Sequence, residues 1–201
     1  MCREPVRRLI AVTQRDACRD DFMGRIEAIA SLRPARIILR EKDLPAGDYQ
    51  TLAKRVRTIC ERWDVPLTLR YAPGETPLAG CGVQLPFGAL ADAPAQGGYG
   101  VSVHALGEAA ALRGSRADYL IAGHIFPTDC KPGLPPRGLD FLRAVCAAVD
   151  RPVYAIGGVT PERVLAVLEA GGSGYCVMKA LMTCPDPRAL IAAYYEKEGA
   201  L

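Results

Sequence analysis

The sequence predicts a parallel (β/α)₈ barrel, the TIM-barrel architecture, on three observations. Short apolar runs suited to strands alternate with segments of helical spacing along the whole chain. Eight such runs fit into 201 residues, so each βα unit is short. No linker or low-complexity tract divides the chain, and we expect one domain over residues 1–201. Regular alternation favours a parallel sheet and eight units favour its closure, with an open doubly wound sheet as the alternative.

Each expected strand is an apolar run of three to five residues. The strands are expected at Leu9–Thr13, Arg36–Leu39, Leu67–Leu69, Gly82–Leu85, Gly100–Val103, Tyr119–Ala122, Val153–Ile156 and Tyr175–Val177. Helical spacing is clearest at Tyr49–Trp63, Leu139–Val149, Pro161–Ala170 and Pro187–Tyr195. The segment 71–96 is rich in Pro, Gly and Ala, so we expect short or irregular helices there.

Composition limits the classes of partner. The net charge is only +3 and the basic residues are scattered, which argues against a nucleic-acid partner. No run approaches the roughly 20 apolar residues of a membrane span, and Leu9–Val12 is too short for a signal peptide. We therefore expect a cytoplasmic protein. The eight cysteines, at positions 2, 18, 60, 81, 130, 146, 176 and 184, form no C-x-x-C pair and favour reduced thiols over disulfides.

Side chains that follow the strands of such a barrel converge at one end, where active sites lie. Those positions hold both histidines of the chain, several cations and a glycine pair: Thr13, Gln14, Arg40, Glu41, Lys42, Arg70, Gln84, Ser102, His104, His124, Gly157, Gly158, Met178 and Lys179.

The clearest of these features is the glycine pair Gly157-Gly158, followed by Thr160 as a candidate N-cap and by Pro161. Glycines let backbone approach a ligand, and N–H groups at such turns bind phosphate. A turn without a ligand explains the pair equally well. Lys179 is expected beside this turn, either contacting the phosphate or lying solvated at a helix start.

His124 opens a long loop after the sixth strand, and its pKa range suits it to move protons at neutral pH. A structural histidine is the alternative, and this alternative is stronger for His104. The Ser102 side chain either faces the interior of the barrel or forms a hydrogen bond with a neighbouring residue. Arg40 and Lys42 alternate with acidic residues, so they either hold an anion or form a surface charge network.

Four ordered motifs cover nearly the whole chain and resemble the thiamine phosphate synthase superfamily. They are Leu39–Asp43, Gly100–His104, Gly123–Lys131 and Ala155–Val159. The superfamily has a synthase branch, which joins a pyrimidine pyrophosphate to a thiazole phosphate with magnesium, and a TenI branch, which contains thiazole tautomerases. The chain is similar to the synthases at Arg40, Lys42, Ser102, Thr128, Lys131 and Gly158.

The chain departs from the synthase pattern where the magnesium carboxylates are expected. The glutamine that the family pattern has two residues before Arg40 is replaced by Ile38. The pattern Asn-Asp-Arg is replaced by Arg70-Tyr71-Ala72, and the pattern His-Leu-Gly-Gln-x-Asp is replaced by residues 84–89. Without those carboxylates we expect no cofactor, and magnesium only if the synthase alternative holds. Lys179 stands where the family usually has a phosphate-binding serine.

His124 stands where synthases usually carry proline, which resembles the TenI branch. The resemblance then implies an isomerase that aromatises a carboxythiazole phosphate, with His124 as its acid–base residue. It implies that the glycine turn with Met178 and Lys179 holds the phosphate. The remaining implied binding residues are Arg40, Lys42, Gln84, Ser102, His104, Thr128 and Lys131. A synthase and a non-catalytic thiazole-phosphate-binding protein are the alternatives, and a homodimer is left open.

Overall fold

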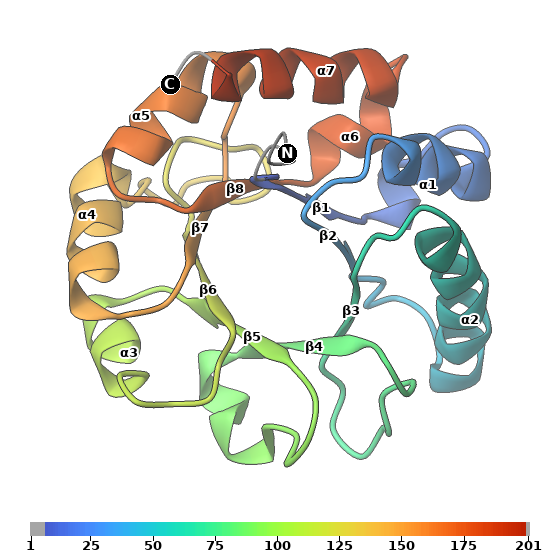
Figure 1. Cartoon of the computed structure of the whole chain (residues 1–201), viewed down its shortest axis with the longest axis horizontal. Coiled ribbons are helices and arrows are strands. Elements are labelled where there is room, and N and C mark those ends of the chain that lie inside the picture. The colour runs from blue at the N-terminus through green and yellow to red at the C-terminus, as the bar shows by residue number, and fades with distance from the viewer. Residues whose placement is uncertain (1–6, 200–201) are drawn as a thin grey trace, which may run out of the picture.

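The computed structural model describes residues 7–199 and forms a closed barrel of eight parallel strands in chain order. Figure 1 looks down this barrel and shows the helices as an outer ring around the strands. The barrel closes because β1 (Leu9–Val12) pairs with β8 (Gly174–Val177), with Ala11 opposite Val177. The predicted fold class is confirmed, and the alternative of an open sheet is wrong.

The observed strands match the expected ones to within a residue at each end. The others are β2 (Arg36–Leu39), β3 (Leu67–Arg70), β4 (Gly82–Pro86), β5 (Tyr99–Val103), β6 (Tyr119–Gly123) and β7 (Val153–Ile156). The helices are α1 (Phe22–Ser31), α2 (Ala46–Arg62), α3 (Leu106–Ala111), α4 (Gly138–Ala148), α5 (Val164–Glu169), α6 (Lys179–Thr183) and α7 (Pro187–Glu198). Three 3₁₀ turns are η1 (Arg15–Ala17), η2 (Phe87–Asp92) and η3 (Pro161–Arg163).

Two helix predictions need comment. The segment 71–96 contains no α-helix, only β4 and the 3₁₀ turn η2, in line with its poor helical pattern. The helix expected over Pro161–Ala170 is divided into η3 and α5. Pro161 takes the first helical turn as predicted, but the side chain of Thr160 makes no capping hydrogen bond.

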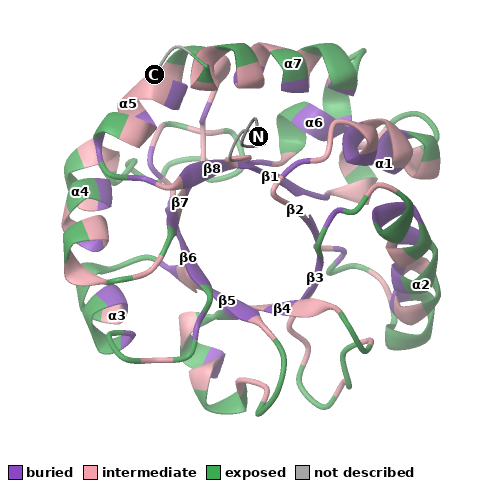
Figure 2. Cartoon of the chain, in the orientation of Figure 1, coloured by how far each residue is buried: buried purple, intermediate pink, exposed green. Residues whose placement is uncertain are grey.

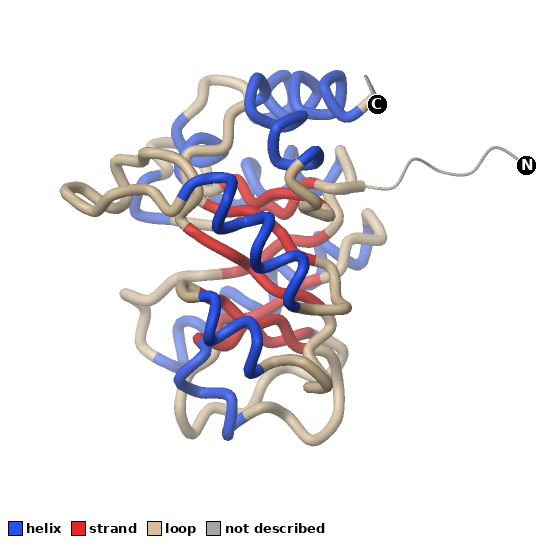
Figure 3. The backbone as a smooth tube through the Cα atoms, turned by 90° about the vertical axis from the view of Figure 1, so that its left-hand side faces the viewer, coloured by secondary structure: helices blue, strands red, loops and turns tan. Residues whose placement is uncertain are grey.

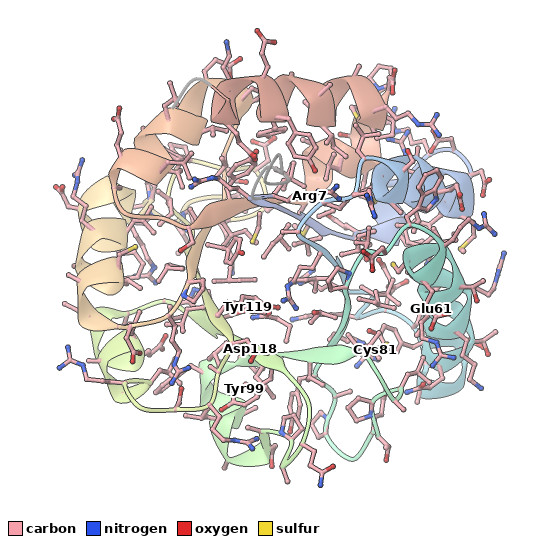
Figure 4. The ribbon with its side chains drawn as sticks, in the orientation of Figure 1. Arg7, Glu61, Cys81, Tyr99, Asp118 and Tyr119 are labelled. Atoms are coloured by element: carbon pink, nitrogen blue, oxygen red, sulfur yellow. The ribbon has the colours of Figure 1, made fainter. Side chains whose placement is uncertain are left out.

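The core has two layers because strand side chains alternate between faces. Outward-facing residues pack against the helices, whose own outer faces are exposed (Figure 2). The inward-facing cluster fills the barrel with Ile10, Val12, Ile38, Tyr119, Ile121 and Cys176. Figure 4 shows the alternation at two labelled rings, with Tyr119 inside the barrel and Tyr99 outside it.

The loops and turns lie at the two ends of the strands (Figure 3). The longest strand-to-helix connection in the described chain runs from His124 to Arg137, between β6 and α4. It folds towards β7 and β8 (Figure 1), since the N–H of Phe126 donates to the carbonyl of Gly157 at 3.0 Å. This loop therefore closes one side of the mouth at the carboxyl ends of the strands.

Among residues 7–199, no helix is long and apolar enough to cross a membrane. The seven cysteines in that range are free thiols, and Cys2 lies outside the described residues. Burial raises the pKa of the Cys60 thiol to about 12, which keeps it protonated and unreactive. The cytoplasmic location and the single domain over 1–201 stay predictions.

Candidate active site

A cavity of about 520 Å³ lies at the carboxyl ends of the strands, a volume in the range of small-molecule sites. All twelve candidate residues line it: Arg40, Lys42, Gln84, Ser102, His104, His124, Thr128, Lys131, Gly157, Gly158, Met178 and Lys179. The structure thus brings them together, while their roles stay predictions. Arg70, Tyr71, Cys130 and Thr160 also line the cavity and were not among the predicted site residues, although Arg70 was expected at a strand end and Thr160 as an N-cap.

Arg40 and Lys42 follow β2, and their acidic neighbours point elsewhere. Glu41 is buried and accepts hydrogen bonds from the Thr13 hydroxyl at 2.5 Å and from the Arg15 N–H at 2.8 Å. Asp43 pairs with the Arg15 guanidinium at 2.5 Å. Within residues 7–199, no carboxylate makes an ion pair with Arg40 or Lys42. The surface charge network is therefore made without them, which favours the anion-binding alternative.

The cations on this side of the cavity are close enough to affect one another. The Arg40 guanidinium holds the pKa of Lys42 below its ordinary value, with further contributions from partial burial and from Lys131 and Arg70. A group of like charges is unfavourable without a counter-ion. An anion bound among these four side chains would relieve that repulsion.

Arg70, at the end of β3, is held in place from three directions. Its guanidinium stacks on the Tyr49 ring at 4.2 Å, and its Nε donates to the Glu41 carbonyl at 2.9 Å. Its Nη2 lies 3.5 Å from Glu75. The sequence predicts that Arg70 lies at a strand end. It gives no sign of the contacts of Arg70, because their residues come from other strands and loops.

The glycine turn faces the cations from the opposite side. Gly157 and Gly158 have φ of +93° and +65°, a region that favours glycine. A Cβ on Gly157 would lie 2.3 Å from the His124 Cβ, and one on Gly158 would lie 2.3 Å from the Pro127 carbonyl oxygen. The two glycines thus let the β6–α4 loop pack closely against the turn. This packing requires glycine at both positions whether or not a ligand approaches the backbone. Among the described residues, no protein acceptor takes the N–H of Gly158 or Val159.

Lys179 begins α6 beside this turn. Its ammonium lies 3.9 Å from the Asp129 carboxylate; the Lys179 side chain is half exposed and that of Asp129 is almost fully exposed. An exposed pair at this distance is weak. Lys179 is therefore free to turn towards an anion at Gly158 at little cost.

The two histidines differ in what fixes them. The Nδ1 of His104 lies 2.8 Å from the Gly123 carbonyl, which also accepts from the Arg137 Nε at 3.1 Å. The Nε2 of His124 lies 3.3 Å from the Leu134 carbonyl. In each neutral ring the nitrogen facing a carbonyl carries the proton. One nitrogen of each ring is thus engaged by the protein, and the other is left to accept from a ligand.

Gln84 and Ser102 form a polar chain across β4 and β5. The Tyr119 hydroxyl donates to Gln84 Oε1 at 2.8 Å, and Gln84 Nε2 donates to the Ser102 hydroxyl oxygen at 3.0 Å. Both ends of the Gln84 amide are satisfied, so its orientation is fixed. The Ser102 hydroxyl proton remains available to a ligand.

The cavity wall does not fit the magnesium ion that the synthase resemblance implies. Magnesium in proteins takes hard oxygen ligands, usually including one or two carboxylates. Among residues 7–199, no aspartate or glutamate lines the cavity, and there is no cluster of three or more metal-ligating side chains.

Comparison with known proteins identifies the family. The model described as "Thiamine monophosphate synthase" matches residues 84–181. The thiamine-phosphate synthase of Thermus thermophilus is 33% identical over 165 residues, covering 79% of this chain and 80% of the relative. The chain belongs to the thiamine-phosphate synthase family.

Two further matches of the family differ in extent. A thiamine phosphate pyrophosphorylase from Pyrococcus furiosus has a similar structure, with a TM-score of 0.82 and 26% identity over 96% of both chains. The thiamine biosynthesis bifunctional protein ThiM/ThiE of Symbiobacterium thermophilum is 34% identical over 86% of this chain, which spans only 38% of that longer relative.

These names overturn one prediction. Relatives along the chain are named synthases, which are transferases, so the isomerase prediction is wrong. It relied on a few side chains, above all His124 in place of proline, whereas the named relatives match most of the chain. The matches support the superfamily without separating its two branches.

Proposed function

We propose that the chain is a transferase that joins a pyrimidine diphosphate to a thiazole phosphate in the barrel mouth. The observation that carries this proposal is one cavity that has a group of cationic side chains on the wall after β2 and β3 and a glycine turn on the wall after β7. Arg40, Lys42 and Arg70 suit a diphosphate, and the Gly157-Gly158 turn suits a single phosphate. The family to which the chain belongs supports thiamine phosphate as the product, and the resemblance described above implies this pair of substrates.

The chemistry is a displacement at the carbon that carries the diphosphate. The ring nitrogen of the thiazole donates its electron pair to form a C–N bond. The carbon–oxygen bond breaks, and its electron pair leaves with inorganic diphosphate. The cations lower the barrier by stabilising charge on the leaving group, and the opposed sites hold the two rings in line.

Between the two anion sites, the side chains of Ser102, His104 and His124 are placed to orient the heterocycles. Each side chain has one hydrogen-bond partner in the described protein, at the distance given above, and one further donor or acceptor atom that can bind a ligand. The apolar floor of Val12, Ile38 and Ile121 suits the faces of the rings. Thr128 and Lys131 belong to the β6–α4 loop at the rim of the same cavity.

The test is to incubate the purified chain with both precursors, with and without magnesium, and to measure thiamine phosphate by chromatography. We expect product from the native chain and at least about a tenfold loss in Arg40→Gln, since hydrogen bonds to charged groups contribute about 1.5–3 kcal/mol. Arg143→Gln is the matched control, because Arg143 lies on α4 and pairs only with exposed Asp140.

Absence of product under every condition, together with tight binding of thiazole phosphate, would replace the transferase by a non-catalytic binding protein.

A further inference from the structure

The wall of the cavity has an unusual charge for a family that the resemblance links to magnesium. Five lysine and arginine side chains line it and, among the described residues, no aspartate or glutamate does. The cations are Arg40, Lys42, Arg70, Lys131 and Lys179. We propose that this chain binds the diphosphate of its substrate without a divalent metal, and that Arg70 supplies the positive charge instead. This inference rests on the proposed transferase function.

The acidic residues near the mouth are already committed to other groups. Both carboxylate oxygens of buried Glu41 accept hydrogen bonds from the β1 side of the barrel. Glu75 pairs with Arg70, and Asp129 extends into solvent beside Lys179. A magnesium ion would therefore find no carboxylate ligand in the wall, and the surrounding cations would repel it.

Arg70 stands at a position where the superfamily pattern has the first residue of Asn-Asp-Arg. Its side chain is only 14% exposed, and the Tyr49 ring and the Glu41 carbonyl hold it in one orientation. Its Nη1 has no protein partner among the described residues, so that end of the guanidinium is available in the cavity. A guanidinium held in this way can donate the N–H groups of its Nη1 to a phosphate oxygen in a charge-assisted hydrogen bond.

Glu75 opposes this role and makes it testable. Its carboxylate lies 3.5 Å from the Arg70 Nη2 and is largely buried, so it offsets part of the charge of Arg70. If Arg70 binds diphosphate, removing Glu75 strengthens binding. If Arg70 only supports the fold, removing Glu75 breaks an ion pair and brings no gain in affinity.

The experiment is calorimetric titration of the full chain with inorganic diphosphate, first with a chelator present and then with magnesium. We expect binding in chelator, with an affinity that magnesium does not increase. Arg70→Gln should lower the affinity about tenfold or more, because it removes charged hydrogen bonds. Glu75→Gln should raise it about twofold or more. Arg143→Gln should leave it unchanged, and thermal melting should establish that each variant folds.

Arg70→Lys covers the case in which the glutamine variant does not fold. It keeps the charge but loses the planar fork, so the affinity should fall with the fold preserved. Binding by the native chain only in magnesium, or an unchanged affinity in a folded Arg70 variant, would overturn the inference and leave the transferase standing. No binding under either condition would remove the diphosphate site from the proposed function as well.

Discussion

The two walls of the cavity offer different physical means of holding the anions of the proposed substrates. The wall formed by β2 and β3 offers the charges of Arg40, Lys42 and Arg70, two of which have no carboxylate partner in the described chain. The wall that follows β7 offers the backbone of Gly157 and Gly158, which have positive φ and line the cavity. Replacing one of several cationic side chains removes only part of the positive charge of that wall. Adding a Cβ to one of the glycines disrupts the backbone conformation of the whole turn. The comparison therefore predicts different responses to mutation.

The largest expected effect is that of Gly158→Ala. The new Cβ would lie 2.3 Å from the Pro127 carbonyl oxygen at a φ of +65°, so the turn and the β6–α4 loop must separate. We expect a loss of at least about 2 kcal/mol, roughly 4–8 °C in the melting temperature, for a chain of this size. Binding of thiazole phosphate should be lost in the same variant, as titration would measure.

Gly114→Ala is the matched control for this variant. Gly114 has a φ of +77°, but an added Cβ there has no atom within 4 Å, and the residue lies away from the cavity. It carries the backbone strain without the collision. Equal losses in the two variants would show that the packing of the loop on Gly158 contributes nothing.

An intermediate effect is expected from pH on the cationic wall. Because its neighbours lower the pKa of Lys42, this lysine loses its proton at a lower pH than an ordinary lysine. The affinity for inorganic diphosphate should therefore fall severalfold as pH rises through that lowered pKa. Lys42→Arg stays charged and should keep its affinity to higher pH. The ionisation of the ligand is common to both proteins, so parallel curves would remove Lys42 from the site.

The smallest expected effect is on the stability of the free protein. A pKa lowered by folding means that charged Lys42 disfavours the folded state below that pKa, and the cost fades as the lysine deprotonates. Lys42→Met should thus raise the melting temperature at neutral pH by a degree or two, since exposed charges contribute less than about 1 kcal/mol. The gain should shrink at high pH, and a constant gain would indicate packing by the methionine instead.

Much of this fold was predictable because the signals that specify strands are local. Val153–Ile156 is an apolar run between Pro152 and Gly157, and Arg36–Leu39 contains three consecutive apolar residues. The structure has strands with the same bounds. The location of the candidate residues at strand ends then placed them at one end of the barrel. Function was less predictable, because a few altered side chains pointed to an isomerase while the chain as a whole matches synthases.

The order of the strands, the residues at their ends and the glycine pair could be predicted from the sequence, since each depends on residues close together in the chain. Which charged side chains remain without an ion-pair partner depends on the tertiary structure. Glu41 turns to Thr13 and Arg15, which lie more than twenty residues away, and so leaves the neighbouring cations exposed to the cavity. Gly157 is required by contact with His124. Such choices depend on which strands become neighbours when the barrel closes, and no local pattern encodes that.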